Sequence, residues 1–221
     1  DKAETDIESA YALNKAAVEV LAQVAKKQHI RLLHVSTDFI FDGQSNDAYE
    51  ITSTTNPKSV YGASKLAGEQ AIQAIYPENS TIVRTWVYSS YGNNFVKTML
   101  RLMSEKEELG VVADQIGCPT YAKTLAKFLW LLAEKDTIKL IYHWSDAGVA
   151  SWYDFAEAIQ DISVELGLLN KQIPINPIPS SAYPTPARRP TFSLLNSSSS
   201  TDVLKPIHWR KQLKSCLLSL K

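Results

Sequence analysis

Two copies of the pattern Tyr-x-x-x-Lys, Tyr11/Lys15 and Tyr61/Lys65, carry the strongest hint of chemistry in the sequence. Residues four apart share one face of a helix, so the ammonium group can lie beside the phenol. A positive charge at that distance typically lowers a phenol pKa of about 10 by about 1–3 units. A tyrosine with such a pKa can protonate a carbonyl near neutral pH. The pattern is short, so at least one copy is a coincidence.

The surroundings of the second copy favour a catalytic role. Tyr61 follows a predicted strand that ends at residues 35–38, and parallel sheets bind ligands beyond the carboxyl ends of their strands. The small residues 62–64 would let a flat cofactor approach the backbone. The plain alternative is a surface helix on which Lys65 pairs with Glu69. Tyr11 neither follows the end of a predicted strand nor precedes a run of small residues.

Two other kinds of chemistry have weaker support. His34, Ser36 and Asp38 alternate onto one face of a strand, but such neighbours lie about 7 Å apart, too far for a hydrolase triad. The sequence also has no G-x-S-x-G elbow. Its four histidines are scattered without carboxylates at a repeated helical spacing, so we expect no metal site within the chain.

Helices and strands alternate along the chain, which predicts an α/β fold: a parallel sheet with helices on both faces, plus a smaller mixed α/β lobe. We expect helices over residues 7–27, 59–75, 95–106, 121–133, from 152 and over 209–220, and strands over 31–36, 81–88, 110–113 and 139–144. Ser151 and Asp154 predict a capping box. Six of the ten prolines crowd residues 174–190, for which we expect an irregular cover.

Composition narrows the possible partners. The 23 basic residues balance 23 acidic ones, so the basic signature of nucleic-acid binding is missing. No apolar run approaches the roughly 20 residues of a membrane span. Two cysteines and the absence of a signal-peptide pattern in the printed sequence lead us to expect a cytoplasmic protein.

Several segments resemble a known family. Residues 34–43, Pro57 and residues 61–69 resemble the catalytic segments of the extended short-chain dehydrogenase/reductases. Within that superfamily, residues 84–88, 92–95, 114–120, 151–152 and 183–190 are similar to the dTDP-4-dehydrorhamnose reductases. The similarity runs from residue 1 almost to the end, and the order of the segments makes it specific.

The resemblance implies a Rossmann-like sheet domain in residues 1–90 and a substrate-binding lobe in residues 91–221, with part of 111–145 returning to the main sheet. It also implies that NADPH or NADH reduces the 4-keto group of dTDP-4-dehydro-L-rhamnose to dTDP-L-rhamnose, in nucleotide-sugar biosynthesis for polysaccharide. The dTDP-sugar would be the main partner. A homodimer, with Mg²⁺ at the subunit interface, is a further implication.

The resemblance implies a role for each residue that matches a site residue of the family. Tyr61 would protonate the C4 oxygen, and Lys65 would hold the nicotinamide ribose and depress the tyrosine pKa. Thr37 would bond the same oxygen and Asp38 the sugar. The resemblance further implies sugar contacts from Trp86 and Asn93, a pyrophosphate clamp at Arg189 and a proton relay at Asn14.

Most of these roles have plain alternatives. Trp86 lies in an apolar strand and fits the core equally well. Asn93 or Asn94 could simply cap the next helix, and Arg188 and Arg189 could be solvated charges.

Two departures from the family matter. The eight glycines form no G-x-x-G-x-x-G or G-x-G-x-x-G motif, the motif that cradles a dinucleotide pyrophosphate. We therefore expect an upstream β-α-β unit of about 70 residues to be missing and the chain by itself to bind the dinucleotide poorly. The family strand at residues 84–86 usually has one more residue, which leaves the register of Trp86 open.

Two other functions stay open. One is a different sugar-nucleotide epimerase or dehydratase, although dehydratases typically have Glu where Phe39 follows Asp38. The other is a non-catalytic regulatory subunit on the same scaffold, such as that of methionine adenosyltransferase.

Overall fold

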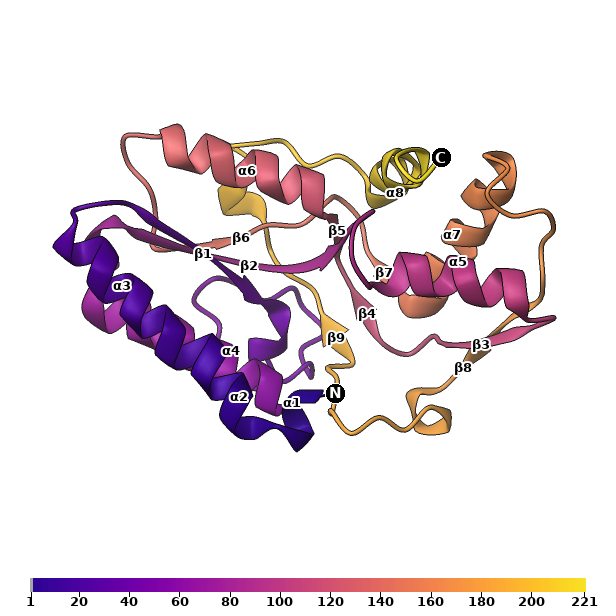
Figure 1. The fold of residues 1–221 in the computed structure, drawn as a ribbon, viewed down its shortest axis with the longest axis horizontal. Helices are drawn as coiled ribbons and strands as arrows, with labels where there is room; N and C mark the ends of the chain where they lie inside the picture. The colour runs from indigo at the N-terminus through magenta and orange to yellow at the C-terminus, as the bar shows by residue number, and fades with distance from the viewer. Residues whose placement is uncertain (1) are drawn as a thin grey trace. The chain divides into compact units, whose positions relative to one another are not determined.

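The computed structural model describes residues 2–221, which form two compact units (Figure 1). The first unit contains the residues up to Thr85 together with Lys127–Trp144 and Thr185–Lys205. The second contains Trp86–Ala126, Ser145–Pro184 and Pro206–Lys221. The division into domains 1–90 and 91–221 stays a prediction, and Asp1 lies outside the described residues.

A parallel sheet organises the first unit. Strand β1 (Leu32–Thr37) pairs with β2 (Ser80–Tyr88), and β2 pairs on its other side with β6 (Ile141–His143). Helices α3 (Ala17–Lys27) and α4 (Val60–Ile75) pack together on one face, and the part of α6 (Ala122–Glu134) in this unit covers the other (Figure 1). The predicted parallel sheet with helices on both faces is confirmed.

The start of α4 lies against the end of β1. The turn η2 (Asp38–Ile40) continues from β1, and a Cβ atom on Gly62 would lie 2.2 Å from the carbonyl oxygen of Phe39. Only a residue without a side chain permits this approach. Ser59 caps α4 by accepting from the Gly62 N–H at 3.1 Å, which fixes where the helix begins.

The N-terminal helical region differs in detail from the single helix expected over residues 7–27. It comprises α1 (Lys2–Thr5), α2 (Ile7–Tyr11), the π-helical turn η1 (Ala12–Ala16) and α3. Hydrophobic spacing cannot reveal a π-turn, because the turn adds a single residue to an otherwise helical pattern. The short helix η3 (Pro77–Asn79) leads from α4 into β2.

A late segment of the chain packs beside the loop that follows β1. Tyr49 donates its N–H to the carbonyl of Leu194 at 2.7 Å and stacks on Phe41. Gly43, with φ of 72°, lies so close to Pro190 that a Cβ atom would be 2.3 Å from the proline Cβ. These contacts hold β9 (Phe192–Ser193) in the first unit, and the Ser200 hydroxyl in the turn η5 (Ser198–Ser200) donates to the His143 carbonyl at 2.6 Å.

The second unit has its own core, built from three helices: α5 (Phe95–Glu105), α7 (Trp152–Glu165) and α8 (Trp209–Leu218). Its strands are short: β3 (Leu109–Val112), β4 (Ile116–Gly117), β5 (Pro119–Tyr121), β7 (Ala150–Ser151) and β8 (Ile175–Ile178). Strand β5 pairs with the last residues of β2, and β4 runs antiparallel to β7. The predicted capping box of Ser151 and Asp154 at the start of α7 is confirmed.

The proline-rich segment is more regular than expected. Residues Ile175–Ile178 form β8, which pairs in parallel with β3 and places Pro177 opposite Val111. The expectation of an irregular cover was wrong at these residues. A two-stranded ladder leaves one side of each strand free, so proline is tolerated on such an edge. The turn η4 (Ser180–Ala182) follows.

Within residues 2–221, none of the helices combines the length and the apolar character that crossing a bilayer requires.

The contact at Gly62 gives a testable prediction. Gly62→Ala should lower the free energy of unfolding by about 2–3 kcal/mol, because its Cβ would overlap a backbone carbonyl despite the better helix propensity of alanine. Gly110→Ala is the matched control: its Cβ would meet only the flexible Ile178 side chain, at 3.3 Å, and should cost less than about 1 kcal/mol. Urea unfolding measures both, and equal losses would contradict the close approach.

Candidate active site

Three of the predicted site residues meet where β1 ends and α4 begins. Thr37 is the last residue of β1, and its hydroxyl donates to the Asp38 Oδ1 at 3.1 Å and accepts from the Phe39 N–H at 3.2 Å. Tyr61, in the first turn of α4, lies close enough to Thr37 and Asp38 for both side chains to act on its pKa. The structure therefore brings two hydroxyls and a carboxyl into one cluster.

Exposure differs sharply within this cluster. Thr37 is 5% and Asp38 1% exposed, whereas Tyr61 is 39% exposed. The Tyr61 ring packs edge-on against Phe39, with ring centroids 6.1 Å apart. Tyr61 is therefore partly open to solvent beside two buried residues, so a ligand can approach the cluster from the tyrosine side.

The expectation that Lys65 depresses the pKa of Tyr61 was wrong. Burial of the hydroxyl raises the pKa of Tyr61, the neighbouring Thr37 hydroxyl partly offsets this, and the negative charge of Asp38 raises it further. The Tyr61 phenol is therefore protonated at neutral pH, and it can act as a proton donor.

Lys65 turns toward β1 instead. Its ammonium group donates to the Val35 carbonyl at 2.7 Å and approaches His34 Nε2 at 3.3 Å. Burial, and next the charge of Lys65, lower the pKa of His34 to about 4, so the neutral imidazole accepts this hydrogen bond. Burial also lowers the pKa of Lys65, against the opposing effect of Glu69. One of the three ammonium N–H groups remains for a ligand.

Asp38 is the most deeply buried group of the cluster. Burial raises its pKa to about 6, partly offset by the nearby Ser193 and Thr37 side chains and by the backbone. Within the described part of the chain, its Oδ2 atom has no hydrogen-bond partner, and neither has the buried Ser36 hydroxyl. Sequence reasoning missed Ser193 because nothing in the spacing connects it with β1.

Two further predicted residues, Asn14 and Arg189, also belong to the first unit. Asn14, in the π-turn, donates from Nδ2 to the Ser64 hydroxyl at 3.0 Å, and Ser64 donates to the Tyr61 carbonyl at 2.9 Å. Arg189 is half-buried beside Pro190, whereas Arg188 is exposed. The relay role of Asn14 and the clamp role of Arg189 stay predictions.

Trp86 and Asn93 belong to the second unit. The Trp86 ring packs against Trp152, with centroids 4.4 Å apart, and it is half-buried. In the structure, Trp86 thus makes the packing contacts that the core alternative predicted. Asn94 caps α5 by accepting from the Val96 N–H at 3.0 Å, whereas Asn93 is exposed. Their sugar contacts stay predictions.

No three His, Cys, Asp or Glu side chains gather as a metal site among residues 2–221.

Comparison with known proteins decides the family. The family model described as "RmlD substrate binding domain" matches residues 1–221. A dTDP-4-dehydrorhamnose reductase of Aggregatibacter actinomycetemcomitans is 41% identical over 222 residues, covering 97% of this chain and 76% of the relative. The chain belongs to the dTDP-4-dehydrorhamnose reductase family.

Other relatives and solved structures support the same family. The spore coat polysaccharide biosynthesis protein SpsK of Bacillus subtilis is 37% identical, over 98% of this chain and 74% of its own length. A crystal structure of a dTDP-4-dehydrorhamnose reductase from Bacillus anthracis in complex with NADP has a TM-score of 0.91 and 33% identity, covering 99% of this chain and 76% of that one. One from Clostridium acetobutylicum has a TM-score of 0.90 and 34% identity, covering 100% of this chain and 76% of that one.

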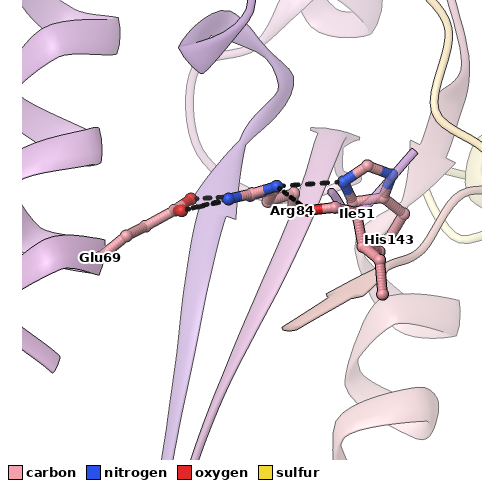
Figure 2. Close-up of polar contacts among 4 residues, drawn as sticks. All are labelled: Ile51, Glu69, Arg84 and His143. Atoms are coloured by element: carbon pink, nitrogen blue, oxygen red, sulfur yellow. Dashed lines mark hydrogen bonds and ion pairs between the residues drawn. The ribbon is translucent and has the colours of Figure 1, made fainter. Parts of the chain in front are cut away.

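In this family member, a buried ion pair anchors the helix that carries Tyr61 and Lys65 (Figure 2). Arg84 of β2 donates from Nη2 to Glu69 of α4 at 2.7 Å, and its Nε also donates to the same carboxylate. Neither side chain is more than 4% exposed. Glu69 is thus paired with Arg84, so the surface pair of Lys65 with Glu69 was a wrong alternative.

The other end of Arg84 holds the loop before α4. Its Nη1 donates to the Ile51 carbonyl at 3.2 Å and lies 3.4 Å from Nε2 of His143 in β6 (Figure 2). Burial, and next the charge of Arg84, lower the pKa of His143 to about 3. The neutral ring donates from Nδ1 to the Tyr49 carbonyl at 3.0 Å and accepts from Arg84. One network therefore ties two strands, the loop and α4 together.

This network gives a second prediction. Arg84→Met should lower the free energy of unfolding by about 3–5 kcal/mol, because it leaves the Glu69 carboxylate buried without a partner. The double variant Arg84→Met/Glu69→Leu should recover most of the loss, since two apolar groups need no partner. As a control, Arg101→Ala breaks an exposed pair with Glu105 and should cost less than about 1 kcal/mol. A double variant no more stable than Arg84→Met would contradict this reading of the network.

Proposed function

We propose that this chain carries the catalytic and sugar-binding residues of a reductase that converts dTDP-4-dehydro-L-rhamnose to dTDP-L-rhamnose with NAD(P)H. The observation that carries the proposal is that Thr37 and Tyr61 lie beside each other at the carboxyl end of β1. Parallel sheets bind their ligands at this edge. Relatives named for this reaction match nearly the whole chain.

The residues present fit the nicotinamide end of the cofactor. When bound, the nicotinamide supplies the hydride, and the protein supplies orientation and electrostatics. Lys65 has one free ammonium N–H and Tyr61 is partly exposed, so the two would hold the nicotinamide ribose. The sequence contains no glycine-rich pyrophosphate motif, and we assign no residue to the cofactor pyrophosphate.

Side chains of this protein would then bind and protonate the substrate carbonyl. Tyr61 donates its proton to the C4 oxygen, and its raised pKa keeps that proton in place beforehand. The Thr37 hydroxyl donates to the same oxygen or to the phenolate that remains. Two preorganised donors at one oxygen stabilise the charge that develops there.

We assign the remaining roles on family resemblance. Trp86 and Asn93 would contact the sugar, Arg189 would clamp the pyrophosphate of the dTDP-sugar in a bidentate manner, and Asn14 would relay protons. A homodimer with Mg²⁺ at its interface belongs to the same set of proposals. The two free, buried cysteines fit a cytoplasmic site of action.

The two Tyr-x-x-x-Lys copies provide a matched test. Tyr61→Phe should lower kcat by about 10²–10⁴-fold, the usual contribution of general acid catalysis, and leave the affinity for the dTDP-sugar within about twofold. Tyr11→Phe removes the hydroxyl of the other copy and should change neither value. NADPH absorbance and titration calorimetry, on the longest gene product that contains this chain, measure both.

Turnover by Tyr61→Phe equal to wild type would remove Tyr61 from the mechanism. Equal losses in the two variants would show that neither copy is specific to catalysis.

A further inference from the structure

We propose that His34 is a positioning residue of the reductase: its imidazole accepts one N–H of the Lys65 ammonium group and thereby leaves another N–H directed to the ribose of the nicotinamide cofactor. The inference rests on the proposed function and deepens it, because it adds a residue that acts on the cofactor through Lys65. The roles taken from the family resemblance include Lys65 but not His34.

Lys65 lies on the buried face of α4. The residue is only 9% exposed, and Gly68 and Glu69 on the same face are also buried. A buried ammonium group loses its water shell, so acceptors of the protein must replace the water. The Glu69 carboxylate is bound to Arg84, at 2.7 Å from its Nη2 atom. Lys65 therefore depends on acceptors from outside its own helix.

Two neighbouring residues of β1 provide these acceptors. The Val35 carbonyl accepts from Lys65 Nζ at 2.7 Å, and His34 Nε2 lies 3.3 Å from the same nitrogen. An ammonium group can only donate, so Nε2 is the unprotonated ring nitrogen and Nδ1 carries the hydrogen. Two acceptors at fixed positions leave the third N–H of the ammonium group a single direction.

The surroundings keep the imidazole of His34 in the form that this contact needs. The ring is half-buried in β1. Burial, and next the charge of Lys65, lower the pKa of His34 to about 4. Nε2 thus accepts a hydrogen bond near neutral pH, whereas a protonated imidazole would have no lone pair to offer. Because the ring is neutral, the pair also keeps the full positive charge of Lys65.

Substitutions of His34 separate hydrogen-bond acceptance from packing. His34→Leu keeps an apolar side chain between β1 and α4 but removes the acceptor, whereas His34→Gln restores an acceptor oxygen on a side chain of similar reach. Calorimetry with NADP⁺, on the longest gene product that contains this chain, measures the effect. His34→Leu should weaken binding by about tenfold or more, because a hydrogen bond to a charged group is lost, and His34→Gln should stay within about threefold of wild type.

Two controls accompany these variants. Leu33→Ala truncates the preceding residue of β1, so it reports what a packing defect in this strand does to NADP⁺ affinity, and the expected change is less than about twofold. Affinity for dTDP should also stay within about twofold in each variant, because Lys65 is assigned to the cofactor. In turnover, His34→Leu should raise KM for NADPH more than it lowers kcat.

A double-variant cycle tests whether His34 acts through Lys65. Lys65→Met removes the ammonium group and should weaken NADP⁺ binding by itself. In that background, His34→Leu should change the affinity by less than about twofold, because no ammonium group remains to be positioned. A loss as large as in the wild-type background would overturn the inference.

Nitrogen-15 NMR of the His34 ring gives a readout that needs neither ligand nor turnover. At pH 7 the ring shifts should identify Nε2 as the unprotonated nitrogen, and Lys65→Met should move the Nε2 shift. A protonated Nε2, or an Nε2 shift that Lys65→Met leaves in place, would contradict the contact.

The two proposals fail in different ways. A wild-type protein that binds NADP⁺ but does not reduce the keto sugar overturns the proposed function. An active wild type in which His34→Leu binds NADP⁺ as tightly as the unchanged protein overturns the positioning role alone. The same holds if His34→Gln binds no better than His34→Leu, because acceptance of the hydrogen bond would then not matter.

Discussion

The close approach of α4 to the end of β1 is the constraint on which the site depends. Gly62 has no side chain, so the first turn of the helix can lie against the Phe39 carbonyl, and Tyr61 reaches Thr37. The ion pair of Glu69 and Arg84 holds the same helix two turns further on. Together these contacts restrict sliding and rotation of α4. They thereby hold the Thr37 and Tyr61 hydroxyls beside the position that the substrate C4 oxygen would occupy.

Burial decides the protonation states in this unit more than neighbouring charge does. Tyr61 has a raised pKa, Asp38 a pKa of about 6, and His34 and His143 pKa values of about 4 and 3. Each shift favours the neutral form, as low-dielectric surroundings do. The site thus keeps the Tyr61 phenol protonated, as a proton donor requires.

The sequence allowed the fold class and the central cluster to be predicted. Alternating helices and strands indicated the parallel sheet, and the position of Tyr61 after the strand that ends at Thr37 indicated their meeting. The direction of Lys65, the role of Arg84 and the contact of Ser193 with Asp38 could not be predicted. They depend on which strand, loop or late segment packs against a side chain, and spacing along one helix carries no such information. The helical spacing of Lys65 and Glu69 favoured a pair between them, but in the folded structure Glu69 pairs with Arg84 instead.

The most direct test of this account is a crystal structure of the longest gene product that contains this chain, with NADP⁺ and dTDP-L-rhamnose bound. The account predicts that the C4 oxygen of the sugar lies within hydrogen-bond distance of both the Tyr61 and Thr37 hydroxyls. A sugar whose C4 oxygen contacts neither hydroxyl would contradict it.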